Sequence, residues 1–221
     1  MKTSLAPKMF RWDFVRGIAD NDFTKVVLLI PVAGYLILFN DEIARLASFD
    51  VLAGVDVNAP SPFVFGGLAK LRMVFFGSLA ILLSYVIYRL FHPTELDVSK
   101  NELEFAELVR QRYSVYELAA MEERVHSPEW AERTDEFWFI LGNPRSKRKI
   151  VSGYRPDVRA YMFREHADYI GYLAREWWAG QMHRYPAARY SSLALGAVGY
   201  VLLALPTSDI AQAVLVHLLL Q

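Results

Sequence analysis

The most suggestive spacing of metal-binding side chains in this sequence is a single Glu-x-x-His, formed by Glu123 and His126. On a helix, residues three apart project from the same face, and paired Glu-x-x-His motifs hold the metals of di-iron helical bundles. Such a site needs two copies of the motif, and the sequence contains one. Because a lone copy arises easily in an acidic helix, we expect no metal here, and Glu123 with His126 stays a weak alternative.

Other catalytic signatures are missing from the sequence. It has no Cys, which excludes thiol catalysis, disulfides and Cys-ligated zinc or iron–sulfur sites. It also lacks the His-Glu-x-x-His of zinc proteases and the Gly-x-Ser-x-Gly of serine hydrolases. The Gly-Lys-Ser/Thr of nucleoside triphosphatases and the Gly-x-Gly-x-x-Gly of dinucleotide-binding enzymes are missing as well. We therefore expect a protein that is not an enzyme and that carries no cofactor.

A short basic run is the strongest local charge feature and comprises Arg145, Lys147, Arg148 and Lys149. Three interpretations are open: a solvated loop, a contact with anionic lipid headgroups worth about 1 kcal/mol per base, or a docking site for an acidic partner or a nucleotide. The whole chain is neutral, with 24 basic and 24 acidic side chains. Binding to nucleic acid through bulk neutralisation of phosphates is therefore not expected. We take these four residues as the candidate contact to a partner or to anionic lipid.

The elements that must position these residues are helices, and the apolar excess of the chain is concentrated in three of them. Hydrophobic residues make up 54% of the sequence, slightly more than the roughly 45–50% of soluble domains. The apolar runs fall in residues 23–40, 69–91 and 188–206, and each approaches the about 20 residues that cross a bilayer. A chain of 221 residues buries too little surface to enclose three helices that are apolar on every face. The sequence predicts an all-α, polytopic membrane protein with three transmembrane helices and a cytoplasmic helical domain.

The distribution of Lys and Arg indicates the orientation of these helices. Residues 92–187 hold 14 of the 24 basic side chains, the N-terminal segment 1–22 holds four, and the loop 41–68 holds one. By the positive-inside rule, the N-terminus and residues 92–187 are cytoplasmic, whereas the loop 41–68 and the C-terminus are external. Lys70 and Arg72 disagree with this pattern and are expected at headgroup level or in an aqueous cavity. A bacterial inner membrane is the expected location.

The N-terminal segment 1–22 is predicted to form an amphipathic helix on the membrane surface. Phe10, Phe14 and Ile18 recur at four-residue spacing, and Lys and Arg occupy other faces. In this interpretation Trp12 lies near the lipid headgroups. A partly ordered tail is the alternative.

The cytoplasmic domain is predicted to contain three helices. A Ser99–Glu102 capping box indicates a helix over residues 100–125. Its apolar face, from three- and four-residue spacing, comprises Leu103, Ala106, Val109, Tyr113 and Tyr116. Further helices are predicted after Pro128 and over residues 156–183. This domain has too few aliphatic residues for a large core of its own, so we expect it to pack against a second copy or a partner.

Small residues and one proline distinguish the interior of the predicted spans. Pro31 removes a backbone hydrogen bond and is expected to kink or unwind the first span. Small residues spaced four apart let helices approach closely, either within one subunit or between subunits. The candidates for such packing are Ala80, Ser84, Ser192, Gly196 and Gly199. Because the central part of each span lacks ionisable residues, a proton-coupled transporter is not expected.

The C-terminal segment 207–221 is open to three interpretations. Asp209, just after Pro206, resembles the start of a new helix. We therefore favour a separate external helix, which lies in the membrane interface or re-enters the bilayer. Continuation of the third span is the remaining alternative.

Together these features predict a membrane scaffold, sensor or regulatory subunit that oligomerises and couples the lipid bilayer to a cytoplasmic protein partner. The prediction rests on the combination of apolar anchors, a charged helical domain and missing catalytic motifs. The alternative from another class is a homo-oligomeric ion channel or membrane-permeabilising effector, which an apolar constriction could gate. We expect no direct contact with nucleic acid.

Overall fold

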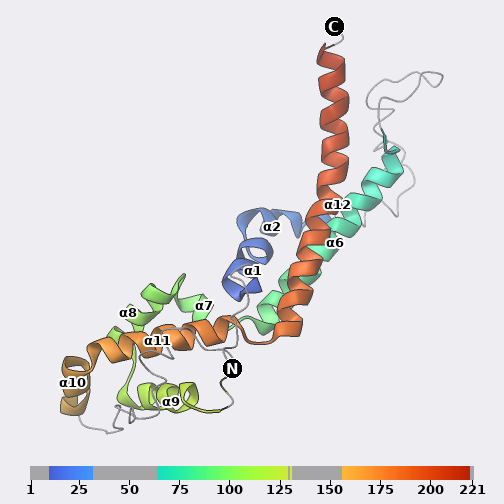
Figure 1. The fold of residues 1–221 in the computed structure, drawn as a ribbon. Helices are drawn as coiled ribbons and strands as arrows, with labels where there is room; N and C mark the ends of the chain where they lie inside the picture. The colour runs from blue at the N-terminus through green and yellow to red at the C-terminus, as the bar shows by residue number, and fades with distance from the viewer. Residues whose placement is uncertain (1–9, 32–63, 129, 131–155, 220–221) are drawn as a thin grey trace. The chain divides into compact units, whose positions relative to one another are not determined.

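The computed structural model describes residues 10–31, 64–128, 130 and 156–219, and every regular element within them is a helix (Figure 1). The all-α prediction is therefore confirmed for this part of the chain. The chain divides into two compact units. The first comprises Met1–Phe14 and His92–Pro186, and the second comprises Val15–Phe91 and Ala187–Gln221.

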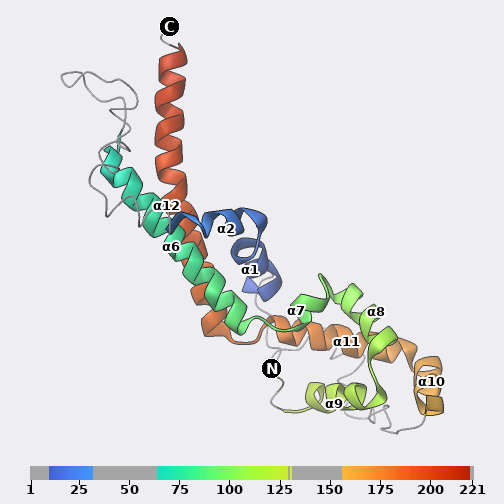
Figure 2. The same ribbon diagram turned by 180° about the vertical axis from the view of Figure 1, so that it is seen from behind.

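Each unit is built from its own set of helices. The first unit contains α7 (Glu95–Val98), α8 (Glu102–Arg112), α9 (Val115–Val125), α10 (Pro156–Glu165) and α11 (Ala167–Met182). The second contains α2 (Asp22–Val27), α6 (Gly67–Phe91) and α12 (Pro186–Leu219), and α1 (Trp12–Ala19) crosses the boundary between the units. Within the second unit, α6 and α12 lie side by side in both views (Figures 1 and 2).

Two of the described helices, not three, are long and apolar enough to cross a membrane by length and composition: Ala69–Phe91 of α6 and Pro186–Leu215 of α12. Most of the predicted first span, 23–40, lies outside the described residues. In the part of this span that is described, α2 ends at Val27, and helical structure resumes only at residues 30 and 31. In a continuous helix, residue 31 would donate its N–H to the carbonyl of Val27, and Pro31 has no N–H to donate. The local unwinding expected at Pro31 is therefore observed.

The separate helix favoured for 207–221 is wrong, and the alternative of a continued helix holds as far as Leu219, because α12 passes through Pro206 without a break. The hydroxyls of Thr207 and Ser208 donate to carbonyls of the preceding turn, at 2.9 Å and 2.8 Å. Such bonds satisfy backbone groups inside a continuing helix, although the same residue types also start helices. Asp209 does not cap a new helix and instead bonds to residues at the start of α6.

The core of the first unit forms where α11 packs against both α8 and α9. It contains the buried side chains of Phe105, Val109, Leu118, Met121, Ile170, Leu173 and Trp178. The rings of Phe105 and Trp178 are 5.6 Å apart between centres. Glu122 is buried in the same unit and accepts a hydrogen bond from the Tyr169 hydroxyl, which offsets the cost of removing a polar group from water.

The helix predicted over residues 100–125 is two helices, because Ser114 starts a new one. Ser114 and Glu117 form a reciprocal capping box at the beginning of α9. The box predicted at Ser99 is wrong, since Ser99 ends α7 and its hydroxyl donates to a carbonyl of α7 at 2.8 Å. The buried face of α8 is displaced accordingly, and Leu103, predicted to be buried, is 66% exposed.

Two other predicted helices differ in detail. The helix over 156–183 is interrupted at His166, whose backbone leaves the helical region between α10 and α11. In α1, Trp12 is fully buried and its Nε1 donates to the carbonyl of Arg184 at 2.8 Å, whereas Phe14 is 45% exposed. Trp12 is therefore packed inside the protein and does not lie at the lipid headgroups as predicted, whereas the membrane contact of Phe10, Phe14 and Ile18 stays a prediction. The helix predicted after Pro128 lies almost entirely outside the described residues.

Candidate functional site

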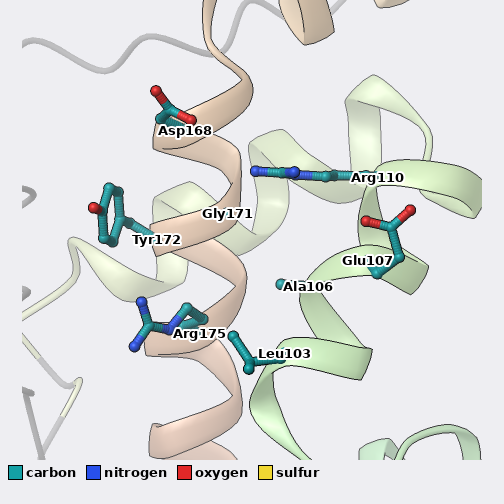
Figure 3. Close-up of a pocket in the computed structure, with 8 residues that line it drawn as sticks. All are labelled: Leu103, Ala106, Glu107, Arg110, Asp168, Gly171, Tyr172 and Arg175. Atoms are coloured by element: carbon teal, nitrogen blue, oxygen red, sulfur yellow. The ribbon is translucent and has the colours of Figure 1, made fainter.

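A pocket of about 340 Å³ lies between α8 and α11 in the first unit (Figure 3). Each helix contributes four side chains at the spacing i, i+3, i+4, i+7, which places them on one helix face. The lining residues are Leu103, Ala106, Glu107 and Arg110 from α8, and Asp168, Gly171, Tyr172 and Arg175 from α11. Two matched stripes thus form the walls of a groove, which we call the α8/α11 groove.

Small residues open the centre of the α8/α11 groove, where Ala106 and Gly171 lie. A Cβ at position 171 would be 2.9 Å from Arg110 Nη2, so glycine leaves space for the arginine to extend toward α11. Arg110 Nη2 also donates to the carbonyl of Ala167 at 3.2 Å. The space at Gly171 and this hydrogen bond together position the Arg110 guanidinium in the groove (Figure 3).

A second guanidinium, that of Arg175, lies further along α11. Its Nη2 is 3.6 Å from Glu102 Oε1, and its guanidinium carbon is 5.9 Å from the centre of the Tyr172 ring. The ion pair is partly exposed, and such pairs contribute about 0–1 kcal/mol. A contact this weak yields to a competing carboxylate or phosphate, which an arginine binds through two parallel N–H groups.

The α8/α11 groove has the composition of a recognition site. Its described lining offers two guanidinium groups, two carboxylates and one phenol, and it contains no Ser, Cys or His. An arrangement of this kind orients a charged partner through several hydrogen bonds.

A buried ion pair joins α6 and α12 in the second unit. Lys70 Nζ lies 2.9 Å from Asp209 Oδ2, and the two side chains are 1% and 3% exposed. Asp209 also accepts the N–H groups of Val64 and Phe65, at 2.9 Å and 3.1 Å. These amides precede Gly67, where α6 begins, and the first N–H groups of a helix have no acceptor within it. One carboxylate of α12 therefore both holds the segment that precedes α6 and pairs with Lys70.

Small and hydroxyl-bearing residues line the rest of the contact between α6 and α12. Ser84 Oγ donates to the Ser192 carbonyl at 2.7 Å, and Ser192 Oγ donates to the Ser84 carbonyl at 3.0 Å. A Cβ at Gly199 would lie 2.5 Å from Ile81 Cγ1 and 2.7 Å from the Gly77 carbonyl oxygen. Since backbone atoms cannot give way as a flexible side chain can, the two helices approach this closely only with glycine at 199.

The other predicted packing residues lie on the same two helices. A Cβ at Gly196 would be 2.8 Å from Ile18 Cγ2 and 3.1 Å from Ser84 Oγ, so Gly196 faces both α1 and α6. Ala80 is half-buried on α6. The predicted partner-contact residues are outside the described part of the chain: Arg145, Lys147, Arg148 and Lys149.

The structure does not bring a metal-binding set together around Glu123 and His126. Glu123 is exposed on α9, and His126 Nδ1 lies 2.9 Å from the carbonyl oxygen of Glu122. Across residues 10–31, 64–128, 130 and 156–219, no three His, Cys, Asp or Glu side chains are close enough to hold a metal ion.

Sequence reasoning missed both the α8/α11 groove and the ion pair. For the groove, a usable signal was the recurrence of charged and small residues at i, i+3, i+4, i+7 in two segments, around Ala106 and Gly171. For the ion pair, the signal was Lys70, a basic residue at the start of one apolar segment, and Asp209, the single acid near the end of another. In each case the pairing depends on how two distant helices align, which periodicity within one helix does not determine.

Comparison with known proteins provides no relative from which a function could be transferred, because no family model, curated protein or solved structure matches the chain. The α8/α11 groove and the contact between α6 and α12 are therefore the basis on which a function can be argued.

Proposed function

We propose that this chain is an integral membrane scaffold or regulatory protein. In this proposal α6, α12 and a first span over residues 23–40 anchor the second unit in the bilayer. The first unit presents the α8/α11 groove to a protein partner that carries acidic groups. The observation that carries the proposal is the distribution of side chains over α6 and α12, where many large apolar side chains are exposed and several polar ones are buried.

The outer surfaces of α6 and α12 are rich in large apolar side chains. On α6 these side chains are 41–71% exposed and include Phe76, Leu83, Val86 and Leu90. On α12 they are 39–59% exposed and include Val198, Val201, Leu205, Val214 and Leu215. The buried positions include the polar side chains of Lys70, Ser78, Ser84, Ser192 and Asp209. In water an apolar surface of this extent is unfavourable. In a bilayer, lipid covers it, and polar groups are satisfied between helices.

The orientation in this proposal follows the basic residues. Residues 92–187 carry 14 of the 24 Lys and Arg side chains, which supports placing them in the cytoplasm, with the N-terminus on the same side and the C-terminus outside. The expected location is a bacterial inner membrane. A second copy of the chain is expected to join it through the apolar outer surface of the spans.

Membrane extraction tests the anchoring. The full chain should stay in the membrane pellet after washes with high salt and with alkaline carbonate, and detergent should release it. Release by carbonate alone would overturn the proposal, because a peripheral protein held by its basic residues leaves the membrane under those conditions.

Site-specific photo-crosslinking tests the partner contact. A photoreactive amino acid at Leu103, which lines the groove and is 66% exposed, should give a defined crosslinked product in intact membranes. Arg112 is the matched control, because it is exposed on the same helix and nine residues further on, which turns it to the opposite face. Equal crosslinking at both positions, or none at Leu103, would contradict the groove as a contact surface.

The buried Lys70–Asp209 pair favours one second candidate, a homo-oligomeric ion channel or membrane-permeabilising effector. Charged residues within membrane-spanning helices commonly mark ion pathways, and both members of this pair lie within the two apolar helices. Purified protein in liposomes would then conduct ions, and Asp209→Asn would change that conductance. A flat recording across voltage removes this candidate and leaves the scaffold proposal in place.

A further inference from the structure

A second pocket of the first unit, separate from the α8/α11 groove, has the chemistry of a cation site. It lies among α7, α9, α11 and the end of α8, and its volume is about 320 Å³. The lining residues are Glu95, Tyr113, Glu117, Ala120, Met121, Arg124 and Trp177. This size falls at the lower end of the roughly 300–1,000 Å³ of small-molecule sites, so a ligand with few atoms fits it.

Both carboxylates of this pocket are fixed by hydrogen bonds. Glu95 Oε1 accepts the indole N–H of Trp177 at 2.7 Å. Glu117 Oε2 accepts the backbone N–H and the hydroxyl of Ser114, at 2.7 Å and 2.8 Å. These hydrogen bonds fix the position of both side chains, so the pocket carries two positioned carboxylates.

The aromatic wall of the pocket is equally well fixed. The Trp177 indole is held by Glu95 and is stacked on Trp130, with 5.3 Å between ring centres and 26° between the planes. Tyr113 packs edge-on against Phe105, at 6.0 Å between ring centres. Indole and phenol rings attract cations through their negative faces, and preorganised rings do so without a cost for ordering them.

Tyr113 is exposed to a negative potential in this pocket. Burial raises the pKa of the Tyr113 phenol above its usual value, and the charges of Glu95 and Glu117 raise it further. The phenol is therefore neutral near pH 7. The electrostatic effect of both carboxylates at one side chain indicates that their fields overlap inside the pocket.

We propose that this pocket binds a small alkylammonium ion. Glu95 and Glu117 supply the opposite charge, Trp177 and Tyr113 supply ring surfaces, and Met121 contacts the alkyl groups. A hydrated metal ion suits the pocket less well, because it needs a cluster of oxygen ligands. Arg124 also lines the pocket, and its positive charge repels the cation and limits the affinity. Removing this charge should therefore tighten binding, whereas removing a carboxylate should weaken it. This ligand site is independent of the proposed membrane role, and either can fail without the other.

Titration of the full chain with tetramethylammonium and with n-butylammonium tests the proposal. With the ¹⁵N-labelled protein in detergent micelles, the indole N–H resonance of Trp177, assigned with Trp177→Phe, should shift and saturate. Potassium chloride at equal ionic strength is the control for screening. A shift that saturates with either alkylammonium supports the site. The proposal is overturned if neither alkylammonium shifts the resonance, or if potassium chloride causes the same shift.

Three single variants separate the charge effect from changes in structure. Glu95→Gln should weaken binding about tenfold, because the charge is lost while the amide oxygen still accepts the Trp177 N–H. Arg124→Gln should tighten binding by about threefold, because a repulsive charge is removed. Glu123→Gln removes an exposed carboxylate of α9 that lines neither pocket, and it should leave alkylammonium binding unchanged. Weaker binding in Arg124→Gln, or equal losses in Glu95→Gln and Glu123→Gln, would overturn the proposal even if one variant folds poorly.

Discussion

Asp209 has an unusual number of donors for a residue in an apolar helix, since the Lys70 ammonium and the amides of Val64 and Phe65 all bond to it. A carboxylate buried in hydrocarbon is costly unless it is paired and hydrogen-bonded. Here both conditions hold within one cluster. Asp209 therefore ties α12 to the beginning of α6, in addition to the Ser84–Ser192 bonds and the close approach at Gly199.

Asp209→Leu should destabilise the protein more than Lys70→Met. The first change leaves a buried ammonium without its carboxylate and two amides without their acceptor. The second leaves a carboxylate that still accepts both amides. Removing one partner of a buried pair costs about 3–5 kcal/mol, and we expect Asp209→Leu in that range and Lys70→Met below it. Thermal unfolding in detergent micelles, followed by circular dichroism, measures both.

The double variant completes the test of this pair. Lys70→Met combined with Asp209→Leu leaves no buried charge at the site, so it should be more stable than Asp209→Leu alone. Strict additivity of the two losses would show that the charges do not couple α6 to α12.

Only part of this residue-scale chemistry can be predicted from the sequence. Lys70 disagrees with the charge pattern of the loops, and that disagreement marks it as unusual. Its partner cannot be predicted, because Asp209 follows Pro206 and resembles a helix start. Local sequence favours a cap at that point, and the contact with α6 decides otherwise.

At the scale of elements, helix boundaries depend on which of several capping residues is used. Ser99, Asn101 and Ser114 all have a glutamate three residues later. Asn101 and Ser114 cap α8 and α9, whereas Ser99 is occupied with a carbonyl of α7. The spacing predicts that a cap exists in this region but does not select among the three.

Ser114→Ala should lower the free energy of unfolding by about 1 kcal/mol, since the side chain that caps the N-terminus of α9 is lost. Thr94→Ala is the matched control. Thr94 occupies the N-cap position of α7 without a side-chain capping bond, so its loss should cost less. Thermal or denaturant unfolding compares the two variants, and equal losses would mean that the capping box at α9 adds nothing.

Gly199→Leu should separate α6 from α12, because its Cβ would overlap Ile81 and a backbone oxygen of Gly77. The absence of native Cys allows a direct readout. Ser84 Oγ and Ser192 Oγ are 3.2 Å apart, so cysteines at these positions should form a disulfide on oxidation. Adding Gly199→Leu to that pair should reduce the yield of disulfide severalfold.

Val198→Leu is the control for this experiment, since Val198 is 53% exposed on the same helix. It should leave the disulfide yield unchanged. Equal yields in the Gly199→Leu and Val198→Leu backgrounds would exclude close packing at Gly199 as the reason for the glycine.

For the whole molecule, hydropathy and helix periodicity predict the helical fold class and the long apolar helices better than they predict binding surfaces. The helical class and the apolar character of α6 and α12 are encoded along each helix, so a single sequence shows them. The α8/α11 groove and the alkylammonium pocket arise where separate helices meet. Their lining residues, such as Gly171 and Trp177, acquire a role only through packing that hydropathy does not describe.

The orientation of the molecule can be tested with single cysteines, because the native chain has none. Glu107 is exposed on α8. In the proposed orientation, Glu107→Cys should react with a membrane-impermeant maleimide only when the cytoplasmic face is accessible. Asn58→Cys, in the predicted external loop 41–68, should react only from the opposite face. Val201 is 58% exposed. In the proposed bilayer, Val201→Cys should nevertheless stay unlabelled from either face until detergent removes the surrounding lipid. Labelling of all three positions from one face would refute a bilayer-spanning orientation, because a chain that crosses the membrane between residues 58 and 107 cannot present both to the same compartment.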